Sequence, residues 1–210
     1  AEDETSLTLN TSCYAAAIEG FGELTRQLAE DRLAPRAQDF SQRSYFGRHQ
    51  RPKAAGLVDW TKSSLEVSRF VRAMNFGGRY SNPFCVAKLV HGGTVLRVGG
   101  ALPVETESNT APGTLIAMDD QGWTVRCGSG AVALSELGCS RGTLWTPGEA
   151  AANLGLSIGS LIGGQDEIDR GALSALHEEL TPLEAYWVGR LSRLDPVEAP
   201  YRTGDGAGRV

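Results

Sequence analysis

Five short segments of strand-forming residues follow one another between residues 84 and 137, and turn residues separate them. The first two, "FCVAKLV" and "TVLRVGGA", flank His91-Gly92-Gly93, a pattern typical of a tight β-hairpin. The other three are "GTLIAM", "GWTVRCG" and "GAVALSEL". Strands this short and closely spaced predict a small antiparallel barrel or barrel-like sheet. Alternation predicts an inward face made of Trp123, Val125, Cys127, Val132 and Leu134.

Two helices are expected before the strands. Residues 5–29 carry one apolar stripe, formed by Leu9, Cys13, Ala17, Phe21, Leu24 and Leu28. The second helix is expected to begin after Ser63, which has the capping-box spacing to Glu66, and to end near Asn75 before Gly77 and Gly78. Its buried face is expected to contain Val67, Phe70, Val71 and Met74. Trp60 precedes the cap and can pack against the helix entry.

Further helices are expected after the strands. Thr146 can cap a helix that starts with Pro147 and stops at Gly155. Beyond a boundary around Gly163-Gly164, two helical pieces are expected. The first covers about 166–180, and the second opens with the capping box Thr181-Pro182-Leu183-Glu184. Leu183, Trp187, Leu191 and Leu194 form the stripe of the second piece, and Tyr186 and Trp187 are expected to pack it onto the body. The tail "YRTGDGAGRV" has the composition of a flexible linker.

Composition narrows the class of protein. The net charge of −5 and the pI near 5.3 argue against general binding to nucleic acid or to anionic lipid. The N-terminal "AEDETSLTLN" is too polar for a signal peptide, and we expect a cytoplasmic protein. The four cysteines are widely spaced and are expected to be reduced and mostly buried. His49, His91 and His177 have no ligand spacing, so no metal site is expected.

The order of several motifs resembles the C-terminal part of the formyltransferase family, which includes methionyl-tRNA formyltransferases. "DETSLTL" resembles the start of the last helix of the catalytic lobe, and "AQDFSQRSYFGR" resembles the interdomain linker. "GLVDWTKSSLEVSRFVRAMN" resembles the family's helix entry and helix end. "APGTLIAMDDQGWTVRCGSGAVALSEL" resembles the strands of the terminal barrel. The resemblance implies an α+β, mainly β, fold: an OB-like open β-barrel preceded by helices, with a C-terminal helical linker.

Within the family, "RSYFGRHQRP" and the Asn-Pro of "RYSNPF" look most like the formylation domains of nonribosomal peptide synthetases. "LHEELTPLEAYWVGRLSRLDPVEAPY" resembles the front of a condensation-type region, although an ordinary amphipathic helix accounts for it equally well. The expected organisation is the last helix of a missing catalytic lobe at 1–30 and a linker at 31–56. The barrel-like domain follows at 57–163, and a helical linker toward the next synthetase region at 164–210. The alternatives are a fragment of a methionyl-tRNA or sugar-nucleotide formyltransferase and a free-standing interaction module.

The resemblance also implies chemistry that these residues do not carry. A catalytic Asn, His and Asp and the pocket for 10-formyltetrahydrofolate belong to the family's N-terminal lobe, and no motif of that lobe occurs here. We therefore expect no enzyme activity from this chain alone, with no catalytic, cofactor-binding or metal-binding residue. The family activity would be transfer of a one-carbon group by the full-length protein.

Two sets of residues are candidates for a role. The first set is expected to be structural and comes from the family motifs: Asp59, Trp60, Arg72, Asn75, Gly113, Gly128 and Gly130. Arg72 is expected to pair with a carboxylate or a carbonyl in the barrel or, alternatively, to touch a carrier protein. The glycines are expected to serve turns with unusual backbone angles. The second set, Arg36, Arg43, Arg48 and Arg51, lies on the linker and is either a solvated strip or a binding strip for an acidic carrier protein. The other expected partners are the catalytic lobe and neighbouring synthetase domains, without membrane or nucleic acid.

Overall fold

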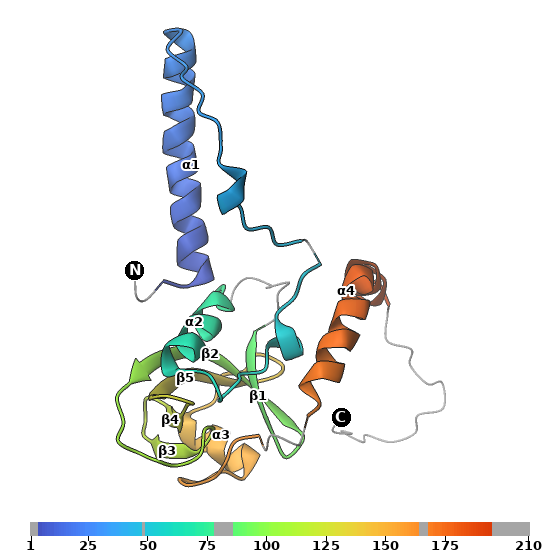
Figure 1. The fold of residues 1–210 in the computed structure, drawn as a ribbon. Coiled ribbons are helices and arrows are strands. Elements are labelled where there is room, and N and C mark those ends of the chain that lie inside the picture. Colours follow the sequence, from blue (N-terminus) through green and yellow to red (C-terminus); the bar gives the residue numbers. More distant parts are fainter. Residues whose placement is uncertain (1–3, 48, 78–85, 164–167, 195–210) are drawn as a thin grey trace.

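The sheet at the centre of the molecule has five antiparallel strands in the order β1-β2-β5-β4-β3 (Figure 1). The computed structural model describes residues 4–47, 49–77, 86–163 and 168–194. Within these, the strands are β1 (Ala87–His91), β2 (Thr94–Val104), β3 (Leu115–Met118), β4 (Trp123–Arg126) and β5 (Ala131–Cys139). Each strand overlaps the run predicted for it, and the sheet does not close. The α+β class with a small open barrel-like sheet is therefore confirmed.

The β1–β2 hairpin shows why the turn residues were informative. Gly92 and Gly93 have φ angles of 55° and 74°, which L-residues adopt with difficulty. They form the two-residue connection between His91 and Thr94, which pair with each other. The start of the first predicted run, including Cys85 and the Asn-Pro of "RYSNPF", lies outside the described residues.

Extended segments cover the two open edges of the sheet. The N–H of Val58 donates to the carbonyl of Lys88 in β1 at 3.0 Å, and the N–H of Leu115 in β3 donates to the carbonyl of Ser160 at 2.9 Å. Because an open edge exposes unpaired backbone groups, these contacts satisfy part of each edge. They also bring residues 57–64 and 158–162 against the sheet, where they complete the barrel-like shape.

The core lies inside the curved sheet and under helix α2. Its largest fully buried side chains are Trp123, Leu96, Leu115, Leu134, Leu137 and Ile162. All five residues of the predicted inward face are buried, which confirms the alternation in β4 and β5. The indole N–H of Trp123 donates to the carbonyl of Pro147 at 3.1 Å, so the ring of a core residue also holds the start of α3.

Helices α2 (Ser64–Ala73) and α3 (Pro147–Leu154) confirm the predicted caps. Ser63 and Glu66 form a reciprocal capping box, and Thr146 and Glu149 form another. Val67, Val71 and Met74 are buried and Phe70 is half-buried against the core, as expected for the inner face of α2. Gly155 ends α3 in the left-handed conformation, with φ of 66°.

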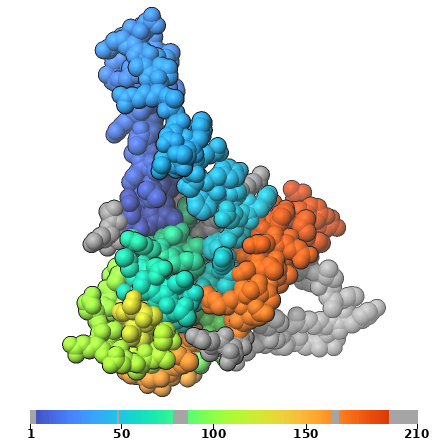
Figure 2. All heavy atoms as spheres, viewed as in Figure 1, coloured from blue at the N-terminus to red at the C-terminus, as the bar shows by residue number. Residues whose placement is uncertain are grey.

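Helix α1 (Ser6–Ala29) forms where it was predicted, but its apolar stripe is not buried. Its first turn is fixed to the end of α2, because the Ser6 hydroxyl donates to Ala73 O at 2.6 Å and Leu7 N–H donates to Asn75 O at 3.3 Å. Beyond that turn the helix extends away from the sheet (Figure 2). Phe21 is 67% exposed, and every other residue of α1 is also at least partly exposed.

The linker after α1 returns along that helix toward the sheet, as Figure 1 shows. It contains two short 3-10 turns, η1 (Phe40–Gln42) and η2 (Lys53–Gly56). Most of it is exposed, as expected for a surface linker. Near its end, Ala54 and Ala55 have φ angles of 49° and 51°, an uncommon conformation for residues other than glycine.

The region after residue 168 corrects the prediction of two helical pieces. One continuous helix, α4 (Arg170–Leu191), contains Pro182 in its interior. Thr181 does not cap a second helix: its hydroxyl donates to His177 O at 2.6 Å within the same helix. Asp169 is the N-cap and accepts hydrogen bonds from the N–H groups of Gly171 and Ala172. Residues 164–167 and the tail 195–210 lie outside the described residues.

Two further expectations about burial are wrong. Tyr186 and Trp187 do not pack α4 onto the body, since Trp187 is 49% exposed and Tyr186 more so, and the two rings contact each other edge to face. Among the described cysteines, Cys127 is buried and Cys139 half-buried, but Cys13 is exposed on α1. Burial raises the pKa of Cys127 to about 11, so this thiol stays protonated. None of the described helices is long and apolar enough to cross a membrane.

Candidate functional site

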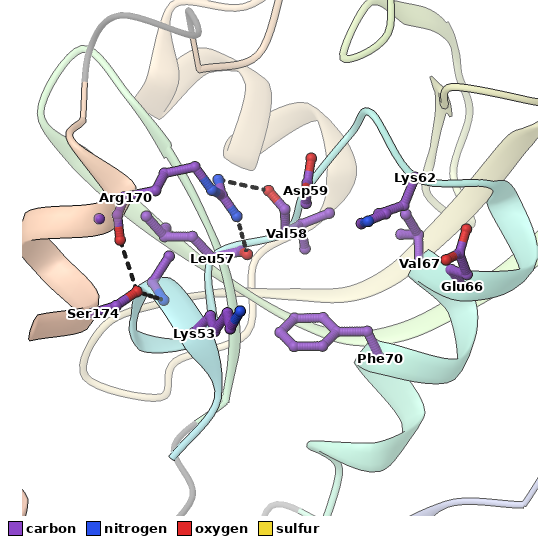
Figure 3. A pocket seen from close by; sticks show the side chains of 12 residues that line it. Lys53, Leu57, Val58, Asp59, Lys62, Glu66, Val67, Phe70, Arg170 and Ser174 are labelled. Atoms are coloured by element: carbon purple, nitrogen blue, oxygen red, sulfur yellow. Dashed lines mark hydrogen bonds between the residues drawn. The ribbon is translucent and has the colours of Figure 1, made fainter. Parts of the chain in front are cut away.

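A groove of about 600 Å³ lies where η2, the start of α2 and the start of α4 meet (Figure 3). Its apolar lining is formed by Ala54, Leu57, Val58, Val67 and Phe70. Charged side chains also line it: Lys53, Asp59, Lys62, Glu66 and Arg170. In Figure 3 the ring of Phe70 lies between the side chains of Lys53 and Lys62. The groove therefore offers an apolar surface beside two ammonium groups.

Helix α4 forms one wall of the groove through specific polar contacts. The Arg170 guanidinium donates to the carbonyls of Leu57 at 2.7 Å and Val58 at 3.2 Å (Figure 3). The Ser174 hydroxyl donates to Arg170 O at 2.7 Å and accepts from the N–H of Ala54 at 2.8 Å. These bonds satisfy backbone groups of a segment that is not part of a regular helix or strand, and they fix α4 beside it.

The two carboxylates at the groove already have partners within the chain. Asp59 accepts from the N–H and hydroxyl of Thr61 at 3.1 and 2.7 Å. Burial raises the pKa of Asp59, but the Thr61 hydrogen bonds and the charges of Arg170 and Lys62 outweigh it and hold that pKa below its usual range. Glu66 accepts from the hydroxyl and N–H of Ser63, which lowers its pKa as well. Both groups are therefore ionised at neutral pH and act as structural acceptors.

Three of the predicted structural residues connect α2 to its surroundings. The Asn75 amide donates to Gly99 O in β2 at 2.8 Å and accepts from the N–H of Gly77 at 2.7 Å. The Arg72 guanidinium donates to Glu4 O at 3.0 Å. The prediction placed this carbonyl partner in the barrel, but it lies in the segment before α1. Trp60 packs against the core at the entry to α2.

The family-motif glycines have two different physical roles. Gly113 and Gly130 have φ angles of 90° and 70°, which agrees with the predicted turn role. A methyl group at Gly113 would lie 3.0 Å from Cδ1 of Trp60. Gly128 does not have a positive φ, and its role corrects the prediction: a methyl group there would lie 2.0 Å from the carbonyl oxygen of Thr61. Glycine is needed at position 128 because the backbone there lies close to the backbone of Thr61.

The predicted arginine strip is smaller than expected. Arg36 and Arg43 are exposed, and Arg43 lies over the ring of Tyr45 at 5.4 Å. Arg51 is not part of an exposed strip: its side chain is 8% exposed and forms an ion pair with Glu184 of α4 at 3.0 Å. Arg48 lies outside the described residues. Only Arg36 and Arg43 of the described members can meet a partner directly.

Charged side chains line both the groove and the cavity next to it. Neither the groove nor the neighbouring cavity of about 730 Å³, which shares Leu57, Val58 and Asp59 with it, is lined by a histidine. Among the described residues, no three side chains of His, Cys, Asp or Glu are grouped to hold a metal ion. Neither lining contains the catalytic Asn-His-Asp set that the family resemblance places in the N-terminal lobe.

The described residues thus form an open antiparallel sheet with α2 packed on it, the helices α1 and α4 beside it, and a groove with apolar and charged side chains in its lining. Residues 51–148 match the family model described as "Formyl transferase, C-terminal domain". A methionyl-tRNA formyltransferase of Methylococcus capsulatus is 33% identical over 136 residues, which are 65% of this chain and 41% of that relative. Those of Xanthomonas campestris and Xanthomonas axonopodis are each 35% identical over 89 residues, 42% of this chain and 27% of each relative.

Residues 51–148 are thus similar to a formyl transferase C-terminal domain. The chain spans about two fifths or less of the length of these curated relatives. The match covers η2, α2, the whole sheet and the start of α3, and it excludes α1 and α4.

Sequence reasoning missed the two residues that hold α4 against the groove. Arg170 and Ser174 contact backbone atoms more than 110 positions earlier in the chain. The only local signal was that both follow Asp169 in the first turns of a helix, one turn apart on one face. That spacing indicates a shared face but does not identify the partner.

Proposed function

We propose that this chain provides the non-catalytic C-terminal domain of an enzyme that formylates an amino group, and that α1 docks this domain onto the catalytic lobe. The family match of residues 51–148 supports the first part. The exposed apolar face of α1 is the observation that supports docking onto the catalytic lobe. In the proposed reaction, a formyl group passes from 10-formyltetrahydrofolate to an amine, and a base must remove a proton from that amine. This proposal assigns the base and the folate pocket to the catalytic lobe.

The geometry of α1 suits a docking helix. At 100° per residue, Leu9, Leu24 and Phe21 fall on one half of the helix, and Ser12, Glu19 and Arg26 fall on the other. Glu23 and Gln27, at one edge of the apolar half, are less exposed than their neighbours. The large side chains of the apolar half, Leu9, Phe21, Leu24 and Leu28, are between 43% and 67% exposed. Because contiguous exposed apolar surface marks an interaction site, this half is the docking face.

A chimera tests the proposal. The N-terminal part of the Methylococcus capsulatus relative, up to its matched region, is joined to this chain. We expect the chimera to formylate an amine substrate and the chain alone to show no activity above background. Phe21→Asp places a charge in the docking face and should lower the activity by about tenfold or more. Ser12→Asp lies half a turn around the same helix and should change the activity by less than about twofold.

Two outcomes would contradict this proposal. Formyl transfer by the chain alone would place the catalytic groups within it. Equal activities of the Phe21→Asp and Ser12→Asp chimeras, with equal helix content by circular dichroism, would show that α1 does not dock through its apolar face. The chain would then fit better with a free-standing interaction module.

For the substrate, we propose an aminoacyl group on an acidic carrier protein, as in a nonribosomal peptide synthetase. The supporting features are the net charge of −5, which disfavours RNA, the exposed Arg36 and Arg43 on the linker, and the exposed Lys53 and Lys62 at the apolar groove. The names of the relatives favour aminoacyl-tRNA as the second candidate. Titrating the chain with an aminoacylated carrier protein and with methionyl-tRNA in one buffer separates these classes.

We expect weak, salt-sensitive binding to the carrier, because exposed charges are screened beyond about 8 Å at physiological ionic strength. The variant Arg36→Glu/Arg43→Glu should weaken that binding by about tenfold, and Glu19→Lys, on α1 and not on the linker, should not weaken it. Tight binding of RNA that the Arg36→Glu/Arg43→Glu variant loses would favour the aminoacyl-tRNA enzyme instead.

A further inference from the structure

Helix α4 contacts the rest of the molecule through polar side chains, and an apolar stripe on another side of the helix is exposed. Arg170, Ser174 and Glu184 all bond to the segment 51–58 or to its side chains. Leu176, Leu180, Leu183, Trp187 and Leu191 form a stripe whose centre lies about 100° around the helix from these contacts. Each of these five side chains is between 49% and 59% exposed. A surface helix normally turns such a stripe inward.

The stripe is held in place and does not belong to a loose helix. Three separate contacts fix α4 against the linker: the Arg170 bonds to Leu57 O and Val58 O, the Ser174–Ala54 bond, and the ion pair of Glu184 with the largely buried Arg51. They are spread over four turns of the helix. The apolar stripe is therefore presented in a fixed orientation on one side of the molecule, where Figure 1 shows α4 beside the sheet.

The charges beside the stripe favour one particular occupant. Glu179 and Arg190 lie on the same edge of the stripe, because eleven residues correspond to about three helical turns. No hydrogen bond or ion pair joins either side chain to another described residue. Their midpoint falls within one residue of the midpoint of the apolar stripe from Leu176 to Leu191. The stripe and its charges are thus arranged symmetrically, with opposite charges at the two ends.

We propose that the α4 stripe is a dimerisation surface for a second copy of this chain, in antiparallel orientation. In a two-fold antiparallel pair of helices, the same edge of each helix meets its counterpart. Glu179 would then face the partner's Arg190, and Arg190 would face the partner's Glu179, while the apolar stripes meet between these pairs. In a parallel two-fold pair the charged edges lie on opposite sides of the interface, so Glu179 and Arg190 would not meet each other. The pair would bury less than the roughly 800 Å² per partner of a standard interface, so the dimer is weak and concentration-dependent.

Sedimentation equilibrium of the whole chain over a range from about 1 μM to about 1 mM tests the proposal. We expect the average mass to rise toward that of a dimer. Leu180→Glu places a charge in the stripe and should raise the dissociation constant by about tenfold or more. Ala185→Glu, on the side of α4 away from the stripe, is the matched control and should leave it within about twofold. Circular dichroism of each variant confirms that α4 still forms.

A charge swap tests the antiparallel arrangement itself. Glu179→Arg and Arg190→Glu should each raise the dissociation constant by about threefold, and the double variant should restore it. A chain that stays monomeric over the whole range overturns the proposal and leaves the stripe for a different protein. A dimer that is unaffected by Leu180→Glu, or a double variant weaker than either single one, overturns it as well. None of these outcomes depends on formyl transfer, because sedimentation equilibrium needs no substrate.

Discussion

Replacing Trp123 with alanine should destabilise the domain by about 4–5 kcal/mol, near the upper end for a single core truncation. The ring is 1% exposed and is the largest fully buried side chain in the core. Its indole N–H also donates to Pro147 O, so the variant leaves a cavity and removes a bond that holds the start of α3. A typical domain has about 5–15 kcal/mol of stability, so this single change removes a large part of it.

Urea unfolding followed by circular dichroism measures this effect. Trp187→Ala is the control, because its side chain is half exposed and its loss should cost less than about 1 kcal/mol. Trp123→Phe keeps most of the volume but loses the indole donor, and should fall between the two. If Trp123→Ala does not fold, the intermediate variant still tests the ranking. Equal midpoints for Trp123→Ala and Trp187→Ala would show that Trp123 is not the centre of the core.

The strands and helix caps were predictable because their signals are local. Gly92-Gly93 specifies a two-residue turn by backbone conformation alone, and Ser63 and Glu66 satisfy each other within one helical turn. The inward face of β4 and β5 follows from the period of two in a strand that is buried on one side. None of these inferences requires knowledge of a residue far away in the chain.

The position of α4 was not predictable for the opposite reason. The sequence predicts a helix start at Pro182, because proline is favoured in the first turn of a helix and disfavoured in its interior. In the structure the helix passes through Pro182, and the hydroxyl of Thr181 bonds to His177 O one turn earlier. Pro182 itself is exposed on the helix.

The prediction that the apolar stripes of α1 and α4 are buried is wrong for a related reason. Periodicity identifies which side chains share a face, but it does not say whether that face has a partner within the same chain. The stripes of α1 and α4 were both correctly placed on one face, and both are exposed in the described residues. Arg51 shows the converse, since a polar linker sequence predicts exposure while an ion pair with Glu184, 133 positions away, buries its side chain. The candidate groove depends on the same long-range contacts.

Gly128 provides the second large effect, and the expected loss for Gly128→Ala is about 3 kcal/mol or more. A methyl group at this position would lie 2.0 Å from Thr61 O and 2.7 Å from the Thr61 carbonyl carbon. Both atoms belong to backbone that cannot move freely, since Asp59 holds Thr61 and the N–H of Ser64 donates to Ser129 O at 2.9 Å. Relief of the clash would separate the β4–β5 turn from the entry to α2.

That separation would also break the bond from Gly128 N–H to Lys62 O, which is 2.8 Å long. Gly148→Ala is the matched control: no atom lies within 4 Å of the added methyl group, and alanine is the better helix former, so stability should rise by up to about 1 kcal/mol. Urea midpoints of the two variants should therefore move in opposite directions. A Gly128→Ala midpoint within error of the parent protein would mean that the turn and the helix entry do not approach this closely in solution. The family motif at Gly128 would then need a cause other than the packing of two backbones.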